Sequence, residues 1–163
     1  MSASTSPFLR TCQQLWAVLL VGVVALAGVV TFLAPTTATL PAVLPVALAA
    51  AIGAAGVVGV LALERLFAAS PPRDDSAALA EYRTRLVLQA VVAEATVALS
   101  VVLAFVFGPA WVAAVGGTFA AAALLLARPS QARFRRLDAA WGAAGADASL
   151  VRGADRARPD RTA

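Results

Sequence analysis

Residues 86–107 have the sequence LVLQAVVAEATVALSVVLAFVF, in which Glu94 is the single ionisable side chain. A helix needs about 20 predominantly apolar residues to cross the roughly 30 Å hydrocarbon core of a bilayer. Lipid offers no hydrogen-bond partners, which favours a helix because a helix satisfies its own backbone; the run also lacks the alternating polarity of a barrel strand. This stretch therefore predicts a membrane-spanning helix.

Three further runs have the same apolar character, and they cover residues 15–33, 45–63 and 110–127. Of the 163 residues, 61% are hydrophobic and 13% are charged, whereas a soluble domain is roughly 45–50% apolar and about 25% charged. This composition excludes a soluble globular domain and also a disordered chain. We predict an all-α polytopic membrane protein in which residues 1–129 form a domain of four transmembrane helices.

The first run, 15–33, has a rival interpretation as a cleaved signal peptide. Its apolar region is 19 residues long, whereas the apolar region of a signal peptide has roughly 7–15 residues. The small residues at 37–39 would make a poor cleavage site. We therefore expect this run to remain as the first span, and cleavage would leave three spans.

The placement of arginine predicts the orientation in the membrane. All thirteen basic residues are Arg: one precedes the first span, four lie between the second and third spans, and eight follow the fourth. The other two connections, 35–44 and 108–109, carry no charge. By the positive-inside rule, the N-terminus, the middle connection and the C-terminus are cytoplasmic. A chain rich in Ala and Arg but without Lys is typical of a GC-rich bacterial genome, so we expect a bacterial inner membrane.

The segment after the fourth span divides into two parts. Apolar residues recur at helical spacing between 130 and 144, which predicts an amphipathic helix. This helix could lie on the inner membrane surface or pack against the cytoplasmic end of the protein itself. In the first case its side chains at the lipid headgroups would be Arg133, Arg135, Arg136 and Trp141. Residues 145–163 have little to bury and predict a disordered cytoplasmic tail, in which interspersed Asp residues argue against nucleic-acid binding.

The third span has polar residues on two different faces. On a helical wheel, Gln89, Thr96 and Ser100 fall within about 40° of each other, and Tyr82 and Arg85 continue this stripe before the span. We expect the three polar residues of the span to hydrogen-bond to a neighbouring helix. Glu94 lies roughly 120–160° away from them, so it faces another helix, a cavity or a second protein. Because ionisable residues inside a membrane are costly and usually functional, Glu94 is the candidate ion-binding residue.

The second span contains the glycines Gly53, Gly56 and Gly59 within a stretch rich in alanine. Small residues let helix backbones approach closely, so we predict that this face packs against another helix. An alternative is that the glycines make room for the carboxyl group of Glu94 or its counter-ion.

The second and third spans together resemble a known hairpin. A helix rich in small residues and a short Arg-bearing loop precede a helix that contains AVVAEA at 90–95 and ends in LAFVF at 103–107. Over residues 47–107 this pattern resembles the helical hairpin of ATP synthase subunit c, although here it lies within a larger four-span chain. In that family the carboxylate of the second helix carries the translocated proton or sodium ion, a role that the resemblance implies for Glu94. The glycines of the family's first helix correspond in kind to those at 53, 56 and 59.

The reactive residues limit the possible functions. The chain has no His and one Cys, so no nucleophile–base pair or metal-ligand cluster is predicted, and we expect neither an enzyme nor a cofactor. We predict a small accessory or scaffold protein that acts through helix–helix packing with a partner or itself, as a homo-oligomer or within a larger membrane complex. The alternative is a proton- or cation-coupled transporter or channel component that uses Glu94.

Overall fold

The computed structural model describes residues 6–33, 41 and 43–156. Within these residues the chain forms six helices and no strand, which confirms the all-helical prediction. The helices are α1 (Pro7–Leu33), α2 (Val43–Ala69), α3 (Asp75–Phe107), α4 (Val112–Leu126), α5 (Gln131–Ala143) and α6 (Leu150–Arg156). Most of the predicted 35–44 connection and residues 157–163 of the predicted tail lie outside the described residues.

Three of these helices, α1, α2 and α3, are each long and apolar enough to cross a membrane. Helix α4 has 15 residues and is therefore only about 22 Å long, which is short of a typical hydrocarbon core. It qualifies as a span only together with α5, from which it is bent by 65°. The structure thus has three candidate spans, or four when α4 and α5 are counted as one.

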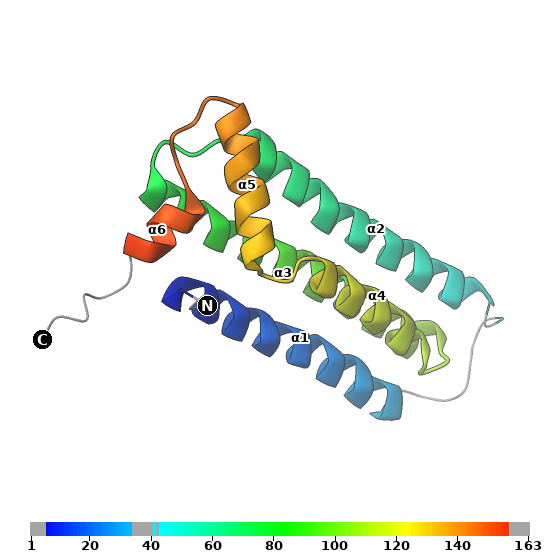
Figure 1. Ribbon diagram of the computed structural model, residues 1–163. Coiled ribbons are helices and arrows are strands. Elements are labelled where there is room, and N and C mark those ends of the chain that lie inside the picture. Colours follow the sequence, from blue (N-terminus) through cyan, green and yellow to red (C-terminus); the bar gives the residue numbers. More distant parts are fainter. Residues whose placement is uncertain (1–5, 34–40, 42, 157–163) are drawn as a thin grey trace, which may run out of the picture.

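Helices α1 to α4 lie side by side, and each runs antiparallel to the next along the chain (Figure 1). Helices α3 and α4 contact each other, and each of them also contacts both α1 and α2. Helices α1 and α2 flank this central pair on opposite sides (Figure 1). The short turn after Phe107 makes α3 and α4 antiparallel neighbours.

The central helix α3 has a defined start and stop. At its N-terminus, the Asp74 carboxylate accepts a hydrogen bond of 2.8 Å from the backbone N–H of Ala77, which is a common helix cap. At its C-terminus, Gly108 has a φ of 54°, a conformation that suits glycine, and Pro109 lacks the N–H that would continue the helix. The 33 residues of α3 span about 50 Å, so the turns before residue 86 extend beyond the apolar run.

These extended turns form part of a compact structure at one end of the bundle, which we term the capped end. It consists of the first turns of α1 and α3, the last turns of α2, and helices α5 and α6 (Figure 1). Its core contains the buried side chains of Phe8, Leu9, Cys12, Ala78, Tyr82, Leu86, Phe134, Leu137, Trp141, Leu150 and Ala154. The capped end therefore joins residues from both ends of the sequence.

Helix α5 packs its apolar side against the protein. Phe134, Leu137 and Trp141 are all buried in the capped end, and the indole Nε1 of Trp141 donates a 3.2 Å hydrogen bond to the carbonyl oxygen of Phe67 in α2. Of the two positions that the sequence left open, the structure has the one in which this helix covers the end of the bundle. Its three large apolar side chains are therefore buried within the protein.

The prediction of a disordered tail from residue 145 is wrong for residues 150–156, because these residues form helix α6. Leu150, Gly153 and Ala154 are buried. The Asp138 carboxylate caps the helix by accepting a 2.7 Å hydrogen bond from the backbone N–H of Leu150. Asp75 of α3 accepts another, of 2.8 Å, from the backbone N–H of Ser149. Asp75 is 74 residues from Ser149 and Asp138 is 12 residues from Leu150, so the composition of the tail itself did not indicate these partners.

Candidate functional site

The inner face of α3 carries a line of buried polar side chains. They are Tyr82, Arg85, Gln89, Thr96 and Ser100, each at most 4% exposed. This is the stripe that the helical wheel predicted, and it points into the bundle over its whole length.

Within this stripe, Thr96 and Ser100 do not form the interhelical hydrogen bonds that we predicted. Their hydroxyl groups donate to the carbonyl oxygens of Val92 and Thr96 in α3 itself, both at 2.9 Å. Their role between helices is steric, because Thr96 lies against Gly56 of α2 and Ser100 lies against Gly116 of α4. Gln89 does bond to a neighbour: its Nε2 donates to the carbonyl oxygen of Val60 in α2 at 3.4 Å.

The glycines of α2 are points of close approach between helices. A Cβ atom added to Gly53 would overlap the ring of Phe119 in α4, and one added to Gly56 would overlap the hydroxyl of Thr96 in α3. At Gly59 the nearest atom would be Cγ1 of Val92, at 3.3 Å. Since these glycines face α3 and α4 side chains other than Glu94, they pack helices together and do not make room for its carboxyl group.

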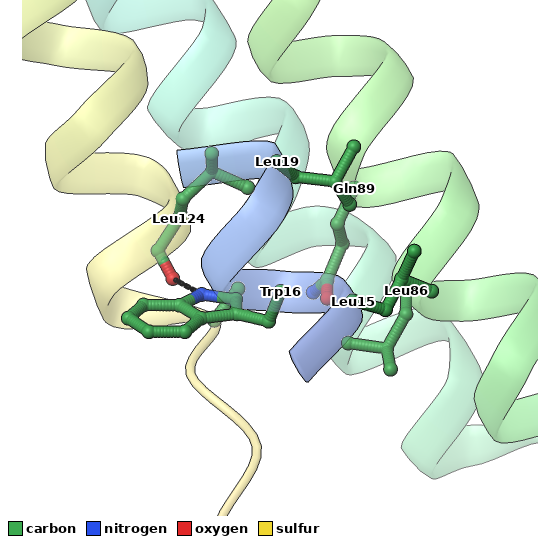
Figure 2. A pocket seen from close by; sticks show the side chains of 7 residues that line it. Leu15, Trp16, Leu19, Leu86, Gln89 and Leu124 are labelled. Atoms are coloured by element: carbon green, nitrogen blue, oxygen red, sulfur yellow. Dashed lines mark hydrogen bonds between the residues drawn. The ribbon is translucent and has the colours of Figure 1, made fainter. Parts of the chain in front are cut away.

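A small cavity lies beside Gln89, between α1, α3 and α4. Figure 2 shows the Gln89 amide reaching from α3 toward Leu15 and Trp16 of α1, while the Trp16 indole donates to the carbonyl oxygen of Leu124 at 2.7 Å. The cavity has a volume of about 10 Å³, which is room for at most one water molecule. It is otherwise apolar, so it is no site for a substrate.

A second polar centre begins one turn before Gln89, where α2, α3 and α5 meet. Glu64 of α2 lies between two arginines: its Oε1 is 3.3 Å from Nη2 of Arg85, and its Oε2 accepts a 2.8 Å hydrogen bond from Nη2 of Arg133. The Arg85 guanidinium also lies 5.6 Å from the centre of the Tyr82 ring. We term Glu64, Tyr82, Arg85 and Arg133 the arginine centre.

Aromatic packing holds the arginine centre in place. The ring of Tyr82 makes an edge-on contact with Phe134 of α5, with centroids 4.7 Å apart, and both rings also contact Phe8 of α1. The Tyr82 hydroxyl is consequently buried. Helices α2, α3 and α5 thus place two guanidinium groups beside a single carboxylate, and the Tyr82 ring lies next to one of these guanidinium groups.

The arginine centre was not predicted from the sequence. Glu64 and Arg85 are opposite charges at the same end of two adjacent apolar runs, and this was the available signal for their pairing. The third member, Arg133, joins them only because α5 folds back over the bundle. Arg133 and Trp141 thus contact the protein, whereas Arg135 and Arg136 are exposed.

The outer face of α3 presents Glu94. This side chain is exposed, and it makes no hydrogen bond or ion pair with any residue in the described part of the chain. Its neighbours on the same face are apolar and also open: Val87 is 52% exposed, Val91 54% and Phe105 51%. The predicted ion-binding carboxylate therefore points away from the bundle, within the most apolar part of the helix.

Over residues 6–33, 41 and 43–156, no three His, Cys, Asp or Glu side chains lie close enough together to hold a metal ion. Comparison with known proteins gives no match, since no protein-family model, curated protein or solved structure is similar to this chain. What the protein does must therefore be inferred from its own side chains.

Proposed function

We propose that this chain is a small accessory or scaffold protein of the bacterial inner membrane, which binds another transmembrane segment through the outer face of α3. The observation that supports this proposal is the exposed carboxyl group of Glu94 on an otherwise apolar face. The bound segment belongs to a partner protein or to a second copy of the chain.

The energetic cost of a carboxyl group exposed to lipid favours an interface in which another transmembrane segment covers Glu94. It lies eight residues into the apolar run, hence roughly 12 Å below its start. A charged side chain at the centre of a membrane helix costs about 2.5–3.5 kcal/mol or more, and such residues usually face protein or water. A polar side chain of another transmembrane helix, donating a hydrogen bond to the carboxyl group, would remove much of this cost.

Orientation and span number belong to the same proposal. We place the capped end in the cytoplasm because the connections at that end carry the arginines, and we treat α4 as the fourth span because it returns alongside α3. Single cysteines would test this in intact cells. A cysteine at Ser76 should be shielded from a membrane-impermeant thiol reagent, and one at Pro109 should react with it; the reverse pattern would overturn the orientation.

Photo-crosslinking in native membranes tests the interface. A photoreactive amino acid in place of Val91, on the Glu94 face, should give one discrete crosslinked product of higher mass. The matched control is Val18, which is 69% exposed on α1 and should give no discrete product. Diffuse or absent products from position 91, equal to those from position 18, would contradict the proposal.

The second candidate function is proton- or cation-coupled transport, and the same exposed carboxyl favours it. A carboxyl that faces outward from one helix can exchange a proton only where another chain or a second copy completes the path. In proteoliposomes carrying a pH gradient, Glu94→Gln should abolish any proton flux and Glu94→Asp should retain part of it. A wild-type flux no faster than that of empty liposomes would exclude this function.

A further inference from the structure

The arginine centre contains more hydrogen-bond donors than its neighbours accept. Its buried atoms without a hydrogen-bond partner in the described chain include the Tyr82 hydroxyl, the Nε, Nη1 and Nη2 atoms of Arg85, and Nη1 of Arg133. Nη2 of Arg85 is within ion-pair distance of Glu64 but is not aligned for a hydrogen bond. Leaving buried donors unpaired is costly, and it is most costly for charged groups.

Charge at the centre is also unbalanced. The charged groups that act on Arg85 are Glu64 from α2 and Arg133 from α5, so that two guanidinium groups face one carboxylate. The Arg85 side chain is 2% exposed, which leaves solvent little opportunity to compensate. A buried excess of one positive charge together with unpaired donors favours an anionic, oxygen-rich ligand.

The exposure of the arginine centre and its position relative to the apolar run further define this ligand. At the edge of the centre the side chains of Glu64 and Arg133 are 27% and 17% exposed, so a ligand would approach the buried donor atoms from the side of α2 and α5. Arg85 immediately precedes the apolar run 86–107, so the centre lies at the expected boundary between hydrocarbon and lipid headgroups. Planar guanidinium groups match the geometry of phosphate oxygens particularly well.

We propose that Tyr82, Arg85 and Arg133 form a binding site for a phosphate group, which is supplied either by an anionic phospholipid or by a free phosphate ion. Two phosphate oxygens accept from the guanidinium nitrogens that Glu64 leaves unpaired, and a further oxygen accepts from the Tyr82 hydroxyl. This site is separate from the Glu94 face, so either proposal can fail without the other.

Thermal unfolding of the full chain in dodecyl maltoside, which contains no phosphate, tests the site. The unfolding temperature is measured during titration with inorganic phosphate against chloride at constant ionic strength, and with phosphatidylglycerol against the phosphate-free lipid monogalactosyl diacylglycerol. We expect phosphate or phosphatidylglycerol to raise the unfolding temperature, and the two reference compounds not to do so. A response to inorganic phosphate identifies a free anion as a sufficient ligand, and a response to phosphatidylglycerol alone identifies the lipid.

Two variants locate the binding. Tyr82→Phe keeps the ring contacts and removes one donor, while Arg133→Gln removes one charge and leaves Glu64 paired with Arg85. Each should raise the midpoint of the titration about tenfold or more, because each removes a hydrogen bond to a charged group. Arg135→Gln is the control, since it removes the same charge from an exposed position of α5, and its midpoint should equal that of the wild type.

The proposal is overturned by either of two results. One is a wild-type unfolding temperature that responds to neither phosphate source, which would mean that water alone satisfies the donors. The other is the lack of a site-specific effect, in which Tyr82→Phe and Arg133→Gln leave the midpoint unchanged or Arg135→Gln raises it as much as Arg133→Gln does. Such a result would indicate general attraction of anions to a basic surface.

Discussion

The two faces of α3 satisfy their polar groups in different ways. On the inner face, Gln89 bonds to α2, while Thr96 and Ser100 bond to their own helix. On the outer face, Glu94 has no such partner within the described residues. The same helix thus uses small polar groups for internal packing and places the one carboxyl group of its apolar run on the outer surface of the bundle. Under the proposed function, interior packing and recognition of a partner would be separate functions of separate faces.

The largest loss of stability is expected where α2 packs against the inner face of α3. Replacement of Gly56 by Leu should prevent α2 and α3 from approaching, because even one added carbon would overlap Thr96, and overpacking of a tight contact costs typically 1–3 kcal/mol or more. Val58 is 64% exposed on the same helix, so Val58→Leu should leave stability unchanged. Unfolding of both variants in detergent measures the difference, and equal small losses would mean that this face does not pack.

A matched pair on α3 itself compares its two faces with a single type of substitution. Ala93 is 1% exposed on the inner side, and Ala95 is exposed. Ala93→Leu should destabilise the bundle by about 1–3 kcal/mol, whereas Ala95→Leu should change the free energy of unfolding by less than about 0.5 kcal/mol. If the Ala95 variant were the less stable of the two, the assignment of inner and outer faces would be wrong.

A smaller, pH-dependent effect is expected at the start of α3. Hydrogen bonds from the Ser76 hydroxyl and the Ala77 N–H hold the pKa of the Asp74 carboxyl below its ordinary value. A lowered pKa in the folded state means that the cap is fully formed above the ordinary pKa and is lost as the pH falls through the folded value. Hydrogen exchange of the first turn should therefore show loss of protection in acid.

The control for this effect is Asp74→Asn, because asparagine also caps helices but does not titrate. In this variant, the protection of the first turn of α3 against hydrogen exchange, corrected for the intrinsic pH dependence of exchange, should not change over the same pH range. Loss of protection at the same pH in both proteins would assign the effect to another group.

The sequence predicted the membrane part of this fold better than its capped end. A long apolar run indicates a helix without information from the rest of the chain. The predicted ends at residues 33 and 107 coincide with the ends of α1 and α3. Wheel geometry also separated Glu94 from the stripe of Gln89 and Ser100, although it could not say which of the two faces is outside. That distinction depends on where α2 and α4 pack.

The capped end was harder to predict because its contacts join distant residues. Helix α6 depends on Asp75 and Asp138 for its caps, and neither carboxylate is close to it in sequence. The arginine centre depends on α5 folding back, which brings Arg133 to Glu64. Amphipathic spacing predicted α5 but not the surface that it covers, because lipid and protein bury apolar side chains equally well.

The most direct test of the central claim uses the crosslink from position 91 together with changes at Glu94. Glu94→Leu should reduce the discrete crosslinked product about tenfold, because it removes the hydrogen bond that the partner makes to the carboxyl group, and Glu94→Gln should retain part of it. Neither change should lower the unfolding temperature of the isolated protein, since the side chain is exposed and makes no hydrogen bond or ion pair within the described residues. The account predicts loss of the partner with an intact fold. An undiminished product in Glu94→Leu, or a fold that fails without the carboxyl group, would contradict it.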